Sequence, residues 1–290
     1  MLRSILFMPG NNEKILSRVE KLNADAVILD LEDGVPPAEK EKARELVYRR
    51  LQSLKVADLK KRIYVRVNGP GMGCMREDLR AVLSPVLDGL MLPMVNSTQE
   101  IHKLTTLLTV LSTGKKDIKL NELSLLLNVE TARGILNLSE LMSATDLVSG
   151  AALGGEDLSL DMRAKRTSGG NEIAYARSHL VMASRAADKL AIDTVFTDIE
   201  DTEGLRKEAR EAARMGYDGK LLIHPSQIEP VNEIFMPAPE EINFARRVVE
   251  AFERGEEEGR GAVKVDGKMV DPPVAARARR ILEMADDRIF

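Results

Sequence analysis

The chain has 290 residues, of which 44% are hydrophobic and 30% are charged, and its formal net charge is −4. This composition is ordinary for a globular protein and supplies enough apolar residues for one large α/β domain. Acidic and basic residues are interspersed, and the lack of a basic tail or stripe argues against nucleic acid as a partner.

The cysteine content and the first residues bear on the cellular compartment. The single cysteine, Cys74, excludes an internal disulfide framework and fits a reducing environment. The chain opens with MLRSILFMPGNNEK, whose apolar run is too short for a secretory signal, and no apolar stretch is long enough to span a bilayer. We therefore expect a cytoplasmic protein with no membrane partner.

Short apolar runs recur along the chain and are predicted to be strands. Their near-continuous hydrophobicity is typical of parallel strands that are covered on both faces. The predicted strands cover residues 4–8, 25–31, 62–67, 88–93, 123–130, 146–153, 193–199 and 219–225. Amphipathic segments between them are predicted to be helices. The first follows Asn12 as its N-cap, and a later one ends at Gly216 as its C-cap.

Eight strands that alternate with helices predict a (β/α)₈ barrel over residues 1–255. A doubly wound open sheet is the alternative, but it usually has fewer strands, and with a dinucleotide it would show a glycine fingerprint in the first βα turn. That turn reads MPGNNEK, which does not match GxGxxG, and the chain has no Walker A sequence. The barrel is therefore the preferred fold class.

Residues 256–290 do not continue this alternation. A charged hinge over residues 256–261 precedes a predicted β-hairpin over residues 262–270, which turns at VDGK. Pro272 and Pro273 then suit the first turn of a final helix. We predict an arm outside the barrel, and because such arms often pack on a neighbouring subunit, we expect a homo-oligomer.

Polar side chains follow most of the predicted strands at their carboxyl ends. They are Asp30, Glu32, Asp33, Arg66, Asn68, Glu130, Glu156, Asp157, Asp198 and His224. One charged residue at such a position is commonly a helix N-cap or part of a surface ion pair. In a barrel, however, all these positions converge on the rim where such enzymes have their active sites. The sequence therefore predicts an active site at this rim.

The crowded carboxylates of the rim predict a bound cation, because without one they would repel each other. Three histidines and one cysteine argue against zinc, whereas oxygen-ligated Mg²⁺ fits, with Glu130 and Asp157 on adjacent strands as the natural pair of ligands. Arg66 is predicted to lie on a buried strand, where an arginine is costly unless it is paired. It is either a structural partner of Glu32 or a fork for a substrate carboxylate.

Eight motifs in order cover essentially the whole chain and resemble one family. They are RSILFMPGNNEKI, DAVILDLEDGVPPAEKEKAR, YVRVNG, VETARGI, GGEDL, DTVFTDIEDTEGL, DGKLLIHPSQI and GKMVDPPV. Together they are similar to the citrate lyase β-subunit and its relatives, the malyl-CoA and citramalyl-CoA lyases. The resemblance implies a (β/α)₈ barrel that cleaves a carbon–carbon bond in a 3-hydroxyacyl thioester.

The resemblance also implies roles for individual residues. Glu130 and Asp157 would hold Mg²⁺, Arg66 would bind the oxo-acid product, and Glu130 would also lie against the substrate. Asp271, in GKMVDPPV, would be a catalytic acid/base that enters the active site of a neighbouring subunit in a trimer or hexamer. Such a cleavage removes a hydroxyl proton and leaves an enolate that needs a proton. We assign Asp271 as the acid and, as the initial base, either a rim carboxylate such as Glu32 or a water molecule next to the metal.

The substrate and its carrier stay open at this stage. Citryl, malyl and citramalyl thioesters are all candidates, carried by CoA or by an acyl carrier protein, the latter with a transferase subunit as a further partner. Relatives often have LPK after the fourth strand, where this chain has LPM, so Met94 replaces a lysine near the expected pocket. The alternatives are a metal-dependent aldolase acting on free 2-oxo acids and a non-catalytic barrel subunit of a larger complex.

Overall fold

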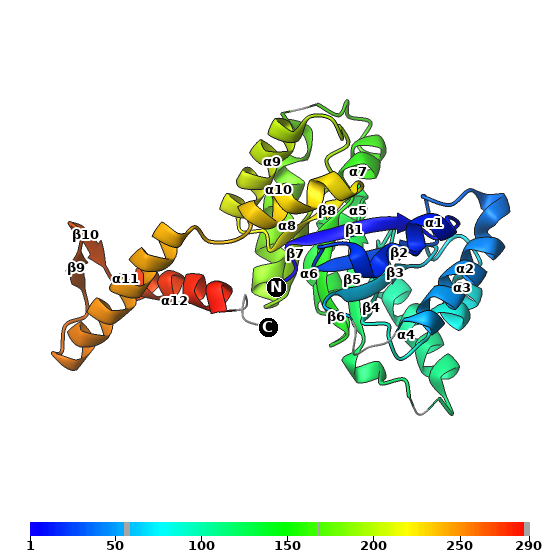
Figure 1. Cartoon of the computed structure of the whole chain (residues 1–290), viewed down its shortest axis with the longest axis horizontal. Coiled ribbons are helices and arrows are strands. Elements are labelled where there is room, and N and C mark those ends of the chain that lie inside the picture. Colours follow the sequence, from blue (N-terminus) through cyan, green and yellow to red (C-terminus); the bar gives the residue numbers. More distant parts are fainter. Residues whose placement is uncertain (55–58, 116, 168, 287–290) are drawn as a thin grey trace. The chain divides into compact units, whose positions relative to one another are not determined.

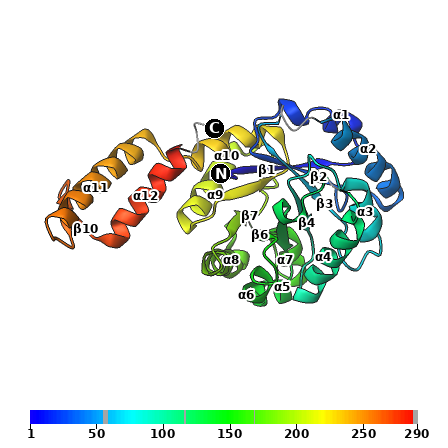
Figure 2. The same ribbon diagram turned by 90° about the horizontal axis from the view of Figure 1, so that it is seen from below.

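The structure is a computed structural model that describes residues 1–54, 59–115, 117–167 and 169–286 (Figures 1 and 2). The chain forms two compact units, of which one comprises Leu2–Asn232 and the other begins at Glu233. The second unit therefore includes helix α11 (Pro239–Glu257), most of which was predicted to belong to the barrel domain over residues 1–255. No helix among the described residues is long and apolar enough to cross a membrane.

The first unit is built on a closed barrel of parallel strands. The strands are β1 (Ser4–Pro9), β2 (Ala26–Asp30), β3 (Arg62–Arg66), β4 (Gly89–Leu92), β5 (Ser124–Val129), β6 (Val148–Leu153), β7 (Leu190–Asp193) and β8 (Gly219–Leu222). Each strand pairs with the next, and β8 pairs with β1. This closure confirms the predicted (β/α)₈ barrel, because a doubly wound sheet would have two open edges.

Helices surround the strands of this unit (Figure 2). They are α1 (Glu13–Leu16), α2 (Lys40–Ser53), α3 (Met75–Val82), α4 (Thr98–Ser112), α5 (Ala132–Leu136), α6 (Leu138–Met142), α7 (Gly155–Asp161), α8 (Ala174–Ala186), α9 (Thr202–Met215) and α10 (Ile228–Ile234). As predicted, Asn12 caps α1 by accepting from Ile15 N at 3.1 Å, although α1 is shorter than expected. Gly216, at a φ of 99°, ends α9 as predicted.

The seventh strand lies earlier in the chain than predicted. The run DTVFTDI, residues 193–199, was taken as the strand, but the chain leaves the sheet after Asp193. The next apolar residues make contacts outside the sheet. Val195 lines a cavity at the barrel mouth, and the carbonyl of Phe196 accepts from Gln227 Nε2 at 2.9 Å. Asp198 is consequently an exposed loop residue, whose Oδ1 accepts from Glu200 N at 3.1 Å, and it does not end a strand.

Apolar side chains from all eight strands fill the barrel interior. The buried cluster comprises Leu2, Ile5, Ala26, Ile28, Tyr64, Met91, Leu126, Ala152, Ile192 and Leu221. Each fully buried leucine, isoleucine or methionine side chain contributes about 1.5–3 kcal/mol to folding. The barrel is therefore a packed core, and chemistry is confined to its ends.

The second unit is a helix pair with a hairpin between the helices. Helix α11 packs on α12 (Pro272–Asp286), and the hairpin consists of β9 (Val263–Val265) and β10 (Lys268–Val270). Asp266 and Gly267 form its turn with φ of 47° and 81°, the left-handed values that a two-residue hairpin turn requires. The predicted hairpin at VDGK and the prolines in the first turn of the last helix are thus confirmed.

Candidate active site

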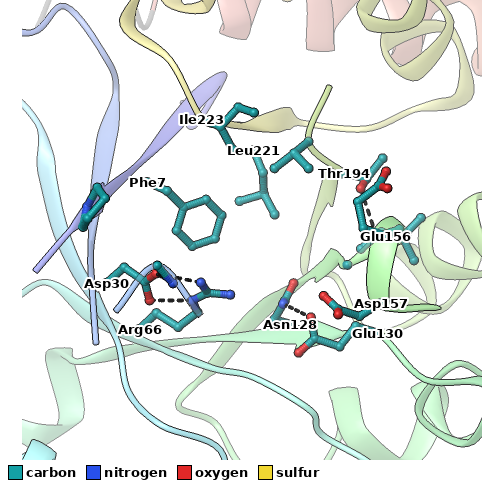
Figure 3. Close-up of a pocket in the computed structure, with 16 residues that line it drawn as sticks. Phe7, Asp30, Arg66, Asn128, Glu130, Glu156, Asp157, Thr194, Leu221 and Ile223 are labelled. Carbon is teal, nitrogen blue, oxygen red and sulfur yellow. Dashed lines mark hydrogen bonds and ion pairs between the residues drawn. The ribbon is translucent and has the colours of Figure 1, made fainter. Parts of the chain in front are cut away.

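A cavity of about 290 Å³ lies at the carboxyl ends of the barrel strands (Figure 3). One side carries charged and polar groups, among them those of Asp30, Arg66, Glu130 and Asp157. The opposite side is apolar and includes Phe7, Leu221 and Ile223. The cavity therefore offers charged groups for a polar reacting centre and an apolar wall that limits access of water.

Arg66 ends β3 and is held by Asp30, which ends β2. The two residues are paired in register, and Arg66 Nε and Nη2 each donate to one carboxylate oxygen of Asp30 at 2.7 Å. Asp30 also accepts from the backbone N–H groups of Glu32 at 2.9 Å and of Gly34 at 2.8 Å. A Cβ on Gly34 would lie 2.5 Å from Asp30 Oδ2, so glycine is required there. Asp30 therefore fixes the orientation of the guanidinium.

Glu32 lies against the same guanidinium. Arg66 Nη1 is 3.0 Å from Glu32 Oε2 and 3.5 Å from Asp33 Oδ2, and the guanidinium carbon lies 4.6 Å from the centroid of the Phe7 ring. Burial raises the pKa of Glu32 to about 7, because the lost hydration outweighs the attraction of Arg66. The structural interpretation of Arg66 as the partner of Glu32 is thus observed, and the Arg66 side chain also lines the cavity.

Glu130 directly follows β5 and is buried, with 2% of its surface exposed. Its Oε1 accepts from the backbone N–H of Met94 at 2.7 Å, and its Oε2 accepts from Asn128 Nδ2. A Cβ on Gly154 would lie 2.4 Å from the Cβ of Glu130, so the glycine that follows β6 makes room for this side chain. A hydrogen bond to each of its two oxygens therefore fixes the orientation of the Glu130 carboxylate.

The environment of Glu130 and Asp157 raises the pKa of both carboxyl groups. Burial raises the pKa of Glu130 to about 8, against the effect of the Met94 hydrogen bond, and the charges of Glu32 and Asp157 add to the increase. Burial also raises the pKa of Asp157, in the first turn of α7, and the charge of Asp33 adds to it. Two carboxylates with raised pKa values that face one cavity are what a cation site requires.

The residues present fit Mg²⁺. Asn128 lines the cavity, and its buried Oδ1 has no hydrogen-bond partner among the described residues, so an oxygen acceptor is available beside Glu130. Within the described part of the chain, no three His, Cys, Asp or Glu side chains form a metal cluster. Mg²⁺ needs no such cluster, since it is commonly bound by one or two carboxylates with water and substrate oxygens. Glu130 and Asp157 can therefore serve as its protein ligands.

Asp271 belongs to the second compact unit, between β10 and α12. Its Oδ1 accepts from Val274 N at 3.3 Å, so it also caps α12. The role of Asp271 in catalysis remains a prediction.

Residues 3–225 match the family model described as HpcH/HpaI aldolase/citrate lyase. The chain belongs to this family. It is 36% identical over 286 residues to the citrate lyase subunit beta of Leuconostoc mesenteroides subsp. cremoris, which covers 98% of this chain and 93% of that protein. It is 35% identical over 293 residues to the mitochondrial citramalyl-CoA lyase of Homo sapiens, covering 98% of this chain and 85% of that protein. The family predicted from the motifs is thereby confirmed.

Two solved structures are similar over most of this chain. The structure of CitE from Mycobacterium tuberculosis in complex with magnesium, acetoacetate and coenzyme A has a TM-score of 0.78 and 32% sequence identity, and the match covers 98% of both chains. RipC from Yersinia pestis has a TM-score of 0.68 and 30% identity, and covers 83% of this chain and 98% of its own. These similarities agree with the predicted barrel.

The structure brings most of the predicted site residues together. Arg66, Glu130 and Asp157 line one cavity, and Glu32 contacts Arg66 from beside it. Three contributors had no assigned role: Asp30, which orients Arg66, Asn128, which orients Glu130, and the backbone N–H of Met94. Asp30 was among the strand-end residues predicted for the rim, but its pairing with Arg66 depends on a strand register that the sequence does not state. A backbone donor carries no signal in the sequence.

Proposed function

We propose that this protein is a Mg²⁺-dependent carbon–carbon lyase, which cleaves a 3-hydroxyacyl thioester into an oxo acid and an acetyl thioester. Citryl-, malyl- and citramalyl-CoA are the candidate substrates. The observation that carries the proposal is the convergence of Arg66, Glu130 and Asp157 on one cavity at the barrel mouth. Relatives named citrate lyase subunit beta and citramalyl-CoA lyase support it.

Glu130 and Asp157 would hold Mg²⁺ in this cavity. When bound, Mg²⁺ would act as a Lewis acid and neutralise negative charge on the oxygens of the oxo-acid half of the substrate. Asn128 keeps Glu130 turned towards the cavity through its bond to Oε2. Gly154 leaves the space that the Glu130 side chain occupies.

Arg66 would bind a carboxylate of the oxo-acid half. Asp30 occupies the edge of the guanidinium formed by Nε and Nη2, so a substrate carboxylate would bind at the edge formed by Nη1 and Nη2, where Nη1 already contacts Glu32 and Asp33. Because Asp30 already fixes the guanidinium plane, little ordering remains to be done when the substrate binds. A planar fork suits both oxygens of a carboxylate.

The proton transfers are assigned to Glu32 and Asp271. Glu32 accepts the proton of the substrate hydroxyl, and its raised pKa of about 7 suits a base at neutral pH. The O–H bonding pair forms the new carbonyl of the oxo acid, the adjacent carbon–carbon bond breaks, and its electron pair moves into the thioester as an enolate. Asp271 of a neighbouring subunit then protonates the enolate carbon, which yields the acetyl thioester.

The assembly proposed with this mechanism is a homotrimer or hexamer in the cytoplasm. In it, the second unit of every subunit would supply Asp271 to the active site of a neighbouring subunit. CoA is the proposed carrier, and an acyl carrier protein with a transferase subunit is the alternative. A metal-dependent aldolase acting on free 2-oxo acids would use the same barrel residues without Asp271. A non-catalytic subunit would not need the paired carboxylates and the oriented arginine.

The test is oxo-acid release from the three CoA esters, with and without Mg²⁺, by the wild type and by Asp271→Asn. We expect Mg²⁺-dependent release from at least one ester and its loss in the variant. Asp266→Asn is the matched control, because this aspartate lies in the hairpin turn of the same unit, where asparagine tolerates the φ of 47°. If Asp271→Asn retains full turnover of the CoA esters, Asp271 is not the acid. If the protein turns over free 2-oxo acids and none of the CoA esters, the aldolase is favoured.

A further inference from the structure

Met94, the second residue after β4, has an unusual backbone conformation. Its φ is 54°, in the left-handed region that residues with a Cβ rarely adopt. Its side chain is 41% exposed, so packing of the side chain does not account for the conformation. Its backbone N–H, however, donates to Glu130 Oε1 at 2.7 Å. The left-handed turn thus directs a backbone donor at the carboxylate assigned to Mg²⁺.

The side chain of Asn96 connects this turn to the segment that carries Glu130. Asn96 Nδ2 donates to the carbonyl of Met94 at 2.8 Å, and Asn96 Oδ1 accepts from the Thr131 hydroxyl. The backbone carbonyl of Asn96 also accepts from Asn137 Nδ2 at 2.8 Å. One amide side chain therefore ties the Met94 peptide to the residue that follows Glu130.

These contacts form a closed ring across the ends of β4 and β5. The ring runs from Glu130 through the Met94 backbone, the Asn96 amide and the Thr131 hydroxyl, and closes along the chain to Glu130. The Asn96 position needs a side chain that donates on one side and accepts on the other, which an amide does. A Cβ on Gly134 would lie 2.5 Å from the Val95 carbonyl, so the start of α5 packs directly on this turn.

We propose that Asn96 is a positioning residue for the Mg²⁺-binding carboxylate of Glu130 and acts through the Met94 backbone. The inference rests on the proposed function, because it takes Glu130 as a metal ligand. Without Asn96, the Met94 carbonyl loses its donor and the left-handed turn relaxes, which turns the Met94 N–H away from Glu130. The carboxylate then keeps only its bond to Asn128 and no longer has one fixed orientation.

Mg²⁺ binding to the full chain, measured by isothermal titration calorimetry, tests this role without turnover. Asn96→Ala is expected to weaken Mg²⁺ binding by about 10- to 100-fold, the usual effect of removing a group that orients a metal ligand. Asn96→Ser, whose shorter side chain does not span both partners, is expected to lie between Asn96→Ala and the wild type. The melting temperature in EDTA is measured for each variant, so that general destabilisation is seen separately.

Asn232→Ala is the matched control, since Asn232 is also a buried asparagine and its Nδ2 donates to the carbonyl of Asn23 at 2.9 Å. It is expected to lower the melting temperature and to leave Mg²⁺ affinity unchanged. The inference is overturned if both Asn96 variants bind Mg²⁺ within about twofold of the wild type. If the wild type does not bind Mg²⁺, the proposed function fails, and this inference fails with it. If the wild type binds Mg²⁺ and the Asn96 variants bind it equally well, only this inference fails.

Discussion

Replacement of Asp30 by asparagine removes the charge that holds Arg66, and we expect it to reduce both stability and turnover. The Asp30 carboxylate accepts from Arg66 Nε and Nη2 and from the N–H groups of Glu32 and Gly34. All these partners are donors, so the NH₂ group of an asparagine must face at least one of them. Arg66 then keeps its ion pairs with Glu32 and Asp33.

The contacts of Arg66 set the size of the effect. Removal of one partner of a buried ion pair costs about 3–5 kcal/mol. Glu32 and Asp33, at 3.0 and 3.5 Å from Nη1, still compensate the guanidinium, so the lower end of about 3 kcal/mol applies. In a unit of this size, that loss lowers the melting temperature by about 6–12 °C. Because the charge of Asp30 contributes to the raised pKa of Glu32, the substitution also lowers that pKa.

Thermal unfolding and the pH dependence of kcat/KM measure the two consequences. The melting temperature should fall, and the acidic limb of the profile should move to lower pH, because Glu32 then stays ionised in more acidic solution. Asp25→Asn is the matched control: Asp25 forms the same fork with Arg3, at 2.6 and 2.8 Å, but at the opposite end of β2. It should lower stability and leave turnover unchanged. An Asp30→Asn protein that melts within about 2 °C of the wild type would refute the reasoning.

Further predictions concern the metal site and the buried charges. Gly154→Ala places a Cβ 2.4 Å from that of Glu130 and should abolish measurable Mg²⁺ binding by calorimetry. Gly71→Ala, where a Cβ meets nothing within 4 Å, should not, and equal binding by both proteins would contradict the packing argument. In EDTA, stability towards urea should fall as the pH rises from about 4.5 to about 8, because Glu130 and Glu32 have folded pKa values of about 8 and about 7, above the ordinary 4.5. In this range the folded state binds protons that the unfolded state has already lost. Added Mg²⁺ should restore the stability, and a flat profile would argue against the raised pKa values. Lys220 donates to Asp193 at 2.8 Å in the core and, with Arg177, holds the pKa of Asp193 below its ordinary value. The ionised Asp193 therefore stabilises the folded state, and this stabilisation is lost as the pH falls through the lowered pKa. Lys220→Met should raise this pKa and move acid unfolding, followed by circular dichroism, to higher pH, and an unchanged midpoint would count against it.

The strands could be predicted from the sequence largely because buried parallel strands are continuously apolar. The prediction of the seventh strand was wrong because the residues after Asp193 are apolar for another reason. The chain leaves the sheet after Asp193, and Val195 lines the cavity. The start of the second unit was also missed, since an amphipathic helix such as α11 fits a barrel layer and a helix pair equally well. Its packing on α12 becomes visible only in three dimensions.

The candidate site was predictable where position along a strand decides it. Glu130 and Arg66 lie at strand ends that converge in any barrel of this type. The pairing of Arg66 with Asp30 depends on the register between β2 and β3, which the sequence does not state. The bond from the Met94 backbone to Glu130 depends on a left-handed turn at a residue that has no preference for one.

Release of the oxo acid from citramalyl-, malyl- and citryl-CoA would show whether this cavity catalyses Mg²⁺-dependent carbon–carbon cleavage. The wild type and Glu130→Gln would be compared at saturating Mg²⁺ and in EDTA, with the acid and the acetyl thioester quantified together. We expect equal amounts of both products from at least one ester, only with Mg²⁺, and their loss in Glu130→Gln. Turnover that persists in EDTA, or that Glu130→Gln leaves intact, would contradict it.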